Sequence, residues 1–300
     1  MDFHIDEQSP IGVFDSGIGG LTVARALQQS LPNETLCYFG DTARVPYGTK
    51  SAETVTRYSE EITRFLWSHG AKMIVVACNT ASSLALEATR ALFPGPVLGV
   101  VEPGVRAALR ATRSGRIGVI GTRSTIESGA YQGRLQAERA DVVVRAQACP
   151  LFVPLAEEGW THDAITRQTA ERYLSPLRDE GVDVLILGCT HFPLLADVIS
   201  EAMGPGVVLV NSAEEVACEV EQRLMQGAGL AAQKHHKDLF YASDDIAGFE
   251  RLYYRICGDA PATFQEAPSD FFAFVQDIYR YRKRLFLGAI PWFEPLEEAR

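Results

Sequence analysis

Short apolar runs alternate with longer amphipathic segments along nearly the whole chain, and this alternation limits the folds open to it. Residues 52–70 and 164–181 have the apolar spacing of surface helices, and each precedes an apolar run. Such alternation predicts an α/β fold whose parallel sheets are covered by helices on both faces. Ligands of such sheets bind beyond the carboxyl ends of the strands. The candidate strands are residues 11–15, 35–40, 73–78, 97–101, 116–121, 142–148, 184–189 and 206–211.

Composition narrows the class of protein. With 300 residues, 47% of them hydrophobic, the chain is long enough for about two domains. A formal net charge of -10 argues against a nucleic-acid partner. No apolar run approaches the roughly 20 residues that span a bilayer, and the acidic start "MDFHIDEQSP" is unlike a signal peptide. We therefore expect a cytoplasmic enzyme that acts on a small molecule, without a membrane partner.

Two of the apolar runs end on a cysteine. In "MIVVACNT" (73–80) the apolar run ends on Cys78, and in "VLILGCTH" (184–191) it ends on Cys189; each thiol is followed by polar residues. The segments around them are also similar, as are 11–20 and 117–129. These echoes predict two related α/β units, joined near the Pro- and Gly-rich stretch 94–104. Each unit would place one thiol in the cleft between them.

The other cysteines carry no such pattern. The sequence has six cysteines, no CxxC pair and no zinc-finger spacing, so we expect no metal site. A chain of this length without a signal peptide is expected in a reducing compartment, where most thiols stay free. A free cysteine taken alone is usually a small core residue.

Two thiols on opposite sides of a substrate can invert a stereocentre, because one removes a proton while the other supplies one. A cysteine between a strand end and a helix N-terminus is expected to have a lowered pKa. None of the five lysines (50, 72, 234, 237 and 283) ends a strand at the cleft, so we expect no pyridoxal and no other cofactor. Polar groups would then stabilise the carbanion. The candidates are Ser16, Asn79, Thr80, Thr122 and Thr190.

Two titratable residues lie beside these positions. Asp15 closes the first strand and could assist a thiol, or could simply cap the next helix. His191 follows Cys189 by two residues and could relay its proton, or could be a core histidine with its hydrogen bonds satisfied. "DSGIGG" lacks the lysine of a phosphate loop and is not GxGxxG, so it predicts a tight turn whose N–H groups face an anion.

The end of the chain departs from the alternation. Residues 212–226 predict a helix with Ser212 as N-cap and Glu215 at capping-box spacing. Residues 236–257 predict one more strand and helix. From about residue 267 the pattern breaks, and helically spaced apolar residues precede the basic "YRYRKR". This tail could pack on the core, or contact a partner or a membrane surface.

Four motifs in order, "GVFDSGIGGLTV", "GDTARVPYG", "ACNTAS" and "GCTHFPLL", resemble the aspartate/glutamate racemase family, and glutamate racemase within it. The likeness covers about residues 10 to 260. It implies cofactor-independent interconversion of L- and D-glutamate by two cysteines, for peptidoglycan synthesis. The alternatives are a racemase of aspartate or another amino acid, and a non-catalytic binding or regulatory protein on the same scaffold.

The resemblance also implies roles for individual residues. Cys78 and Cys189 match the two catalytic thiols, Asp15 the residue that assists the first, and His191 and Glu157 those near the second, although Glu158 lies beside Glu157. The positions that match substrate contacts are Asp15, Ser16, Tyr47, Gly48, Asn79, Thr80, Thr122, Thr190 and His191.

The family's domain organisation implies that the chain returns to its first domain. We therefore expect residues 1–98 with about 211–265 in one α/β domain, 99–210 in a second, and 266–300 as a tail of open role. The active site would lie in the cleft between the two domains. A homodimer is compatible with an enzyme of this size.

Overall fold

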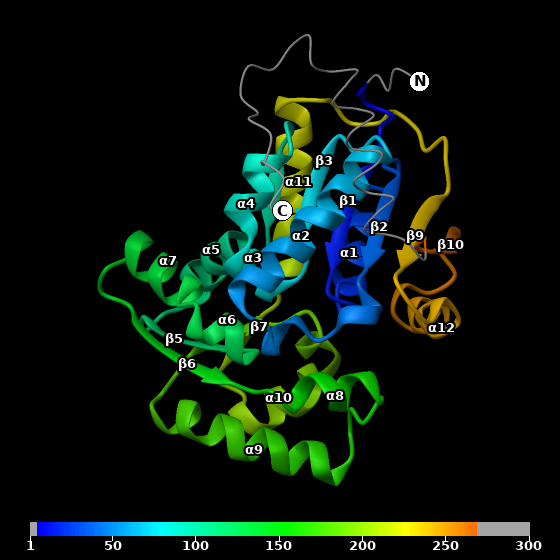
Figure 1. Cartoon of the computed structure of the whole chain (residues 1–300). Coiled ribbons are helices and arrows are strands. Elements are labelled where there is room, and N and C mark those ends of the chain that lie inside the picture. Colours follow the sequence, from blue (N-terminus) through cyan, green and yellow to red (C-terminus); the bar gives the residue numbers. More distant parts are fainter. Residues whose placement is uncertain (1–4, 269–300) are drawn as a thin grey trace, which may run out of the picture.

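The computed structural model describes residues 5–268, and it contains two parallel sheets (Figure 1). The larger sheet has the strand order β10-β9-β2-β1-β3-β4 and the smaller one β6-β5-β7-β8. Both sheets carry helices on their faces, so the predicted α/β fold with two parallel-sheet domains is confirmed. The strands are β1 Ile11–Asp15, β2 Leu36–Gly40, β3 Met73–Val76, β4 Val97–Gly99, β5 Arg116–Gly121, β6 Val143–Ala148, β7 Val184–Gly188, β8 Val208–Val210, β9 Asp238–Ala242 and β10 Ala262–Glu266.

Alternate strand residues enter separate cores. In β1, Val13 packs with helices α1, α11 and α12, whereas Phe14 packs with α2 on the other face. The smaller sheet likewise has α8, α9 and α10 against one face and α5 with α7 against the other. The helices are α1 Leu21–Ser30, α2 Ala52–Ser68, α3 Asn79–Leu84, α4 Leu86–Leu92, α5 Val101–Ala111, α6 Arg123–Glu127, α7 Ala130–Glu138, α8 Phe152–Glu157, α9 Ala164–Asp179, α10 Ala196–Met203, α11 Ser212–Gln226 and α12 Ile246–Cys257.

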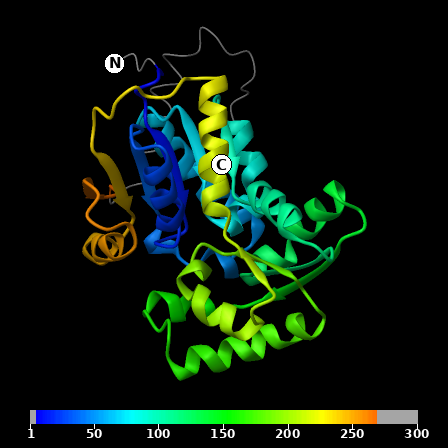
Figure 2. The same cartoon turned by 180° about the vertical axis from the view of Figure 1, so that it is seen from behind.

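The two sheets share one topology. The order β2-β1-β3-β4 in the first corresponds to β6-β5-β7-β8 in the second. Strands β3 and β7, which lead to Cys78 and Cys189, therefore occupy equivalent places beside the central strands β1 and β5. This agrees with the internal similarity of the sequence. After β8 the chain returns along α11 and adds β9 and β10 to the first sheet, as the view from behind shows (Figure 2).

Two local features differ from the sequence-based expectations. The N-cap of α11 is Asn211, not Ser212: the Asn211 side chain accepts a hydrogen bond from the Ala213 N–H (3.2 Å). The backbone is still extended at Asn211, directly after β8, so an equally good capping residue comes one position earlier. Strand β10 was not anticipated, because this partly exposed edge strand lacks the continuous apolar run of the buried ones.

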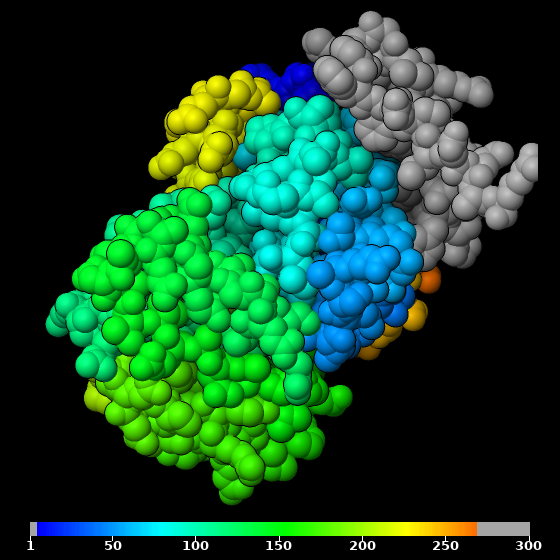
Figure 3. Space-filling view, turned by 60° about the vertical axis from the view of Figure 1, so that its left-hand side comes forward, coloured from blue at the N-terminus to red at the C-terminus, as the bar shows by residue number. Residues whose placement is uncertain are grey.

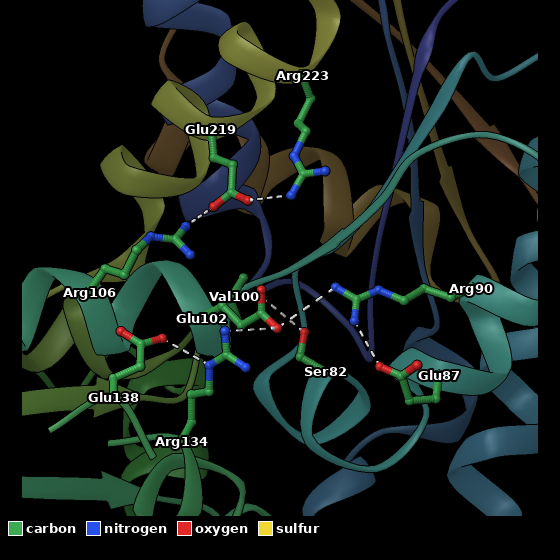
Figure 4. A network of polar contacts seen from close by, with 10 residues as sticks. All are labelled: Ser82, Glu87, Arg90, Val100, Glu102, Arg106, Arg134, Glu138, Glu219 and Arg223. Carbon is green, nitrogen blue, oxygen red and sulfur yellow. Dashed lines mark hydrogen bonds and ion pairs between the residues drawn. The ribbon is translucent and has the colours of Figure 1, made fainter. Parts of the chain in front are cut away.

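Helix α5 lies at the junction of the two domains and is surrounded by ion pairs (Figure 4). Its Glu102 lies 4.0 Å from Arg90 of α4 and 3.9 Å from Arg134 of α7. Its Arg106 pairs with Glu219 of α11. Each partly exposed pair stabilises little alone, but together they tie helices of both halves to α5. The residue boundaries of the domains stay a prediction.

Three further observations concern the part of the chain from residue 5 to residue 268. None of its helices is long and apolar enough to cross a membrane. It contains no group of three His, Cys, Asp or Glu residues placed to hold a metal ion. The predicted amphipathic tail lies almost entirely outside the described residues.

Candidate active site

A small cavity lies where carboxyl ends of strands from both sheets meet. Both thiols and nearly all the predicted substrate-contacting residues line it, whereas Asp15 and Glu157 are in contact with lining residues from behind. In the space-filling view the second domain, in green, packs directly against the blue and cyan first domain (Figure 3). The lining residues are Ser16, Val45, Pro46, Tyr47, Gly48, Cys78, Asn79, Thr80, Thr122, Val153, Cys189, Thr190 and His191.

Cys78 is the N-cap of α3, as its place between a strand and a helix suggested. Its Sγ accepts a hydrogen bond from the Ala81 N–H (3.5 Å), and the residue is buried. The predicted lowering of the Cys78 pKa is wrong for the ligand-free protein. Burial, together with the charge of Asp15, raises the pKa of the thiol to about 12, although the Ala81 N–H and the Ser16 hydroxyl oppose the shift. Desolvation outweighs the N-terminus of a helix that has only six residues.

Cys189 has a different set of partners. His191 Nδ1 lies 3.8 Å from its Sγ, and His191 Nε2 lies 3.1 Å from Glu157 Oε1. Burial alone would lower the pKa of His191. The hydrogen bonds to Cys189 and Glu157 and the charges of Cys189 and Asp15 instead raise it to about 10. Glu158 is exposed, so the carboxylate in contact with His191 is that of Glu157.

Asp15 connects the two domains beneath the cavity. Its Oδ2 accepts from the Gly17 N–H (3.0 Å), and its Oδ1 accepts from the Thr190 hydroxyl (3.2 Å). The N-cap of α1 is Gly20, so Asp15 does not cap that helix. Burial raises the pKa of Asp15, and the charge of His191 and the hydrogen bonds of Gly20, Gly17 and Thr190 oppose this shift. A carboxylate with these partners can hold the segment around Thr190 in place.

Hydroxyl groups form a second link across the cavity. The Thr80 hydroxyl of the first domain lies 2.9 Å from Thr122 Oγ1 and 3.2 Å from Thr125 Oγ1 of the second. The Ser124 hydroxyl donates to the Gly48 carbonyl (2.9 Å). Polar groups on both walls are therefore already paired with each other, and a ligand would have to enter among them.

The loop before α2 is held by a buried network that sequence reasoning missed. The hydroxyl of Tyr47 donates to Asp41 Oδ2, and Arg44 Nε also lies 2.6 Å from this oxygen. Ser243 donates to the other Asp41 oxygen (2.9 Å). Asp41 is fully buried and follows β2 directly. An acidic residue at the carboxyl end of a buried strand was the signal that could have revealed it.

Gly48 approaches Thr122 so closely that a side chain has no room. A Cβ at position 48 would lie 2.4 Å from Thr122 Cβ, an atom that side-chain rotation cannot move away. We expect Gly48→Ala to push the two domains apart and to lower kcat/KM by about 100-fold, since small displacements of reacting groups are enough for that. Steady-state kinetics of the purified variant measures the effect.

Gly133 provides the matched control for that substitution. It lies inside α7, and apart from its chain neighbours and the adjacent helix backbone no atom lies within 4 Å of a Cβ placed there. Gly133→Ala should leave kcat/KM unchanged and raise the free energy of unfolding by about 0.5–1 kcal/mol, because alanine favours the helix. Equal activity of both glycine variants would show that the contact of Gly48 with Thr122 is unimportant.

The raised pKa of Cys78 has a measurable consequence. Alkylation by iodoacetamide requires the thiolate. With a pKa near 12, the thiolate fraction of Cys78 in the ligand-free protein should increase about tenfold per pH unit between pH 7 and 10. Peptide mass spectrometry should show this increase, with the exposed Cys218 labelled first as the internal reference. A labelling rate of Cys78 that levels off below pH 9 would contradict the assignment.

The structure thus brings one thiol from each of two related α/β domains to a single cavity lined by hydroxyl and amide groups. Comparison with known proteins shows the class of protein to which this site belongs. Residues 20–219 match the family model described as Asp/Glu/Hydantoin racemase. The glutamate racemase of Geobacter metallireducens is 55% identical over 251 residues, which are 83% of this chain and 92% of that protein.

Solved structures extend the comparison to the fold. Glutamate racemase isoform RacE1 of Bacillus anthracis superposes with a TM-score of 0.84 at 39% identity, over 88% of this chain and 98% of that one. The glutamate racemase of Francisella tularensis, solved with D-glutamate, gives 0.82 at 33% identity, over 87% and 98%. The chain belongs to the Asp/Glu/hydantoin racemase family, and within it to the glutamate racemases. It is therefore an isomerase, and the alternative of a non-catalytic scaffold has no support.

Proposed function

We propose that this enzyme interconverts L- and D-glutamate without a cofactor, with Cys78 and Cys189 as the two bases. One observation supports this most: thiols from two topologically equivalent strands line the same cavity. Support for glutamate comes from the relatives and from the Francisella structure solved with D-glutamate.

The chemistry divides between the two walls of the cavity. The thiolate on one side removes the proton from Cα and becomes a thiol. The thiol on the other side donates its proton to the opposite face of Cα and becomes a thiolate. Each turnover thus leaves the two cysteines with exchanged protonation states, so the enzyme is ready for the reverse reaction.

The neighbouring groups have different tasks in this proposal. The raised pKa of His191 favours an imidazolium, whose Nδ1 lies 3.8 Å from the Cys189 sulfur and can exchange a proton with it. The substrate ammonium group, once bound, would offset the desolvation that holds Cys78 as a thiol. The hydroxyl and amide groups of Ser16, Asn79, Thr80, Thr122 and Thr190 would bind the carboxylates and stabilise the negative charge that develops.

The same proposal includes the biological setting. D-glutamate would be supplied in the cytoplasm for peptidoglycan synthesis, by a homodimer. The family resemblance supports the supply of D-glutamate for peptidoglycan synthesis in the cytoplasm. The frequency of symmetric dimers among enzymes supports the homodimer.

The test follows the purified protein with L-glutamate in deuterated water and no added cofactor. Optical rotation should fall to zero while NMR shows deuterium at Cα. L-Aspartate under identical conditions serves as the control for the substrate. Exchange with aspartate alone would contradict glutamate as the substrate, and no exchange with either would contradict the racemase mechanism.

A further inference from the structure

We propose that Tyr131 is a positioning residue that orients the side chain of Asn79 and so sets the affinity for substrate, a role that rests on the proposed function. Tyr131 lies on α7 of the second domain and is fully buried. Its hydroxyl donates a 2.6 Å hydrogen bond to Asn79 Oδ1, in the first domain. Asn79 directly follows Cys78 and lines the cavity.

This hydrogen bond determines which end of the amide is free. A carboxamide has one accepting oxygen and one donating NH₂ group, and only the latter binds a carboxylate. Because Tyr131 donates to the oxygen, the amide is held with its oxygen toward Tyr131. The NH₂ group is then the part available for a substrate carboxylate, without an energy penalty for turning the side chain during binding.

The ring of Tyr131 also contacts the segment of the other thiol. Gly188 precedes Cys189, and a Cβ at Gly188 would lie 3.3 Å from Cε2 of the Tyr131 ring. Burial and, to a lesser degree, the charge of Cys189 raise the pKa of the Tyr131 hydroxyl, so it stays a donor at neutral pH. One side chain thus contacts both thiol-bearing segments. Since its hydrogen bond crosses between the domains, the amide is held in place only when the domains are together.

The hydroxyl can be separated from the ring by substitution. Tyr131→Phe keeps the packing and leaves Asn79 Oδ1 without its donor. We expect KM for L-glutamate to rise by about tenfold, in line with the loss of one buried hydrogen bond, while kcat changes less than threefold. A role in packing alone would not give this division between KM and kcat.

Tyr253→Phe is the matched control. Tyr253 is also fully buried, and its hydroxyl donates to the Ala260 carbonyl (3.2 Å) and accepts from Gln28 Nε2 (3.0 Å), away from the cavity. Both variants remove one buried hydroxyl and should lose similar stability in urea unfolding. A rise in KM should follow only from Tyr131→Phe.

A double-mutant cycle tests the partner. In an Asn79→Ala background, adding Tyr131→Phe should raise KM no further. Independent, multiplicative effects in the cycle, or an unchanged KM in the single variant of an enzyme that racemises L-glutamate, would overturn the positioning role alone. Wild-type protein that does not act on L-glutamate would overturn the proposed function, and this role with it.

Discussion

Replacing Cys189 by alanine is expected to lower kcat for racemisation by about 10³- to 10⁴-fold in both directions, since one acid–base group is lost on one face of the substrate. The fold should persist. Cys189 is a small buried residue beside Gly188, and alanine keeps the strand end intact. Circular dichroism and polarimetry of the same sample would separate loss of activity from loss of structure.

The Cys189→Ala variant retains Cys78 as a base, so hydrogen exchange can be measured separately from racemisation. With Cys78 still present, the α-proton of one enantiomer should still exchange with deuterated water, without racemisation. Cys78→Ala should retain exchange of the other enantiomer instead. Cys218→Ala, at an exposed position of α11, should leave both activities unchanged. Racemisation by Cys189→Ala at the wild-type rate would exclude a two-thiol mechanism.

The sequence predicted the parts of this site that depend on local pattern. Apolar runs identified β3 and β7, and in parallel sheets ligands bind beyond the carboxyl ends of such strands. The placement of Cys78, Asn79 and Cys189 along one cavity follows from that rule and from the similarity of the two halves. Their catalytic and binding roles remain proposals.

Other features depend on contacts between segments far apart in the chain, which no local pattern reveals. Burial of Cys78, together with the charge of the distant Asp15, reverses the pKa shift expected from its helix terminus. The hydrogen bond of Tyr131 with Asn79 joins residues 52 positions apart. The contact of Glu157, rather than Glu158, with His191 depends on the orientation of the short helix α8. Each of these required the tertiary structure.

A second large effect is expected at the amino ends of the strands of the first sheet, opposite the cavity, where Lys72 and Glu34 form a buried ion pair. Lys72 Nζ lies 2.8 Å from Glu34 Oε2 and donates to the carbonyls of Glu7 (2.6 Å) and Gly229 (3.2 Å). Glu34 Oε1 accepts from the Ala231 N–H (2.8 Å). The pair therefore attaches the segment between α11 and β9 to the amino ends of the central strands.

Lys72→Met should lower the free energy of unfolding by about 3–5 kcal/mol, because methionine fills the space but leaves the Glu34 carboxylate buried without its counter-ion. Stabilities of domains are typically about 5–15 kcal/mol, so urea unfolding should show a large shift of the midpoint. Adding Glu34→Gln removes the unpaired charge, keeps an acceptor for Ala231 and should restore at least half of the loss. The kcat of the folded fraction should not change, since the pair lies at the amino ends of the strands, whereas both thiols lie at the carboxyl ends. A loss below about 1 kcal/mol in the single variant would show that water reaches Glu34 and that the pair does not hold the returning segment.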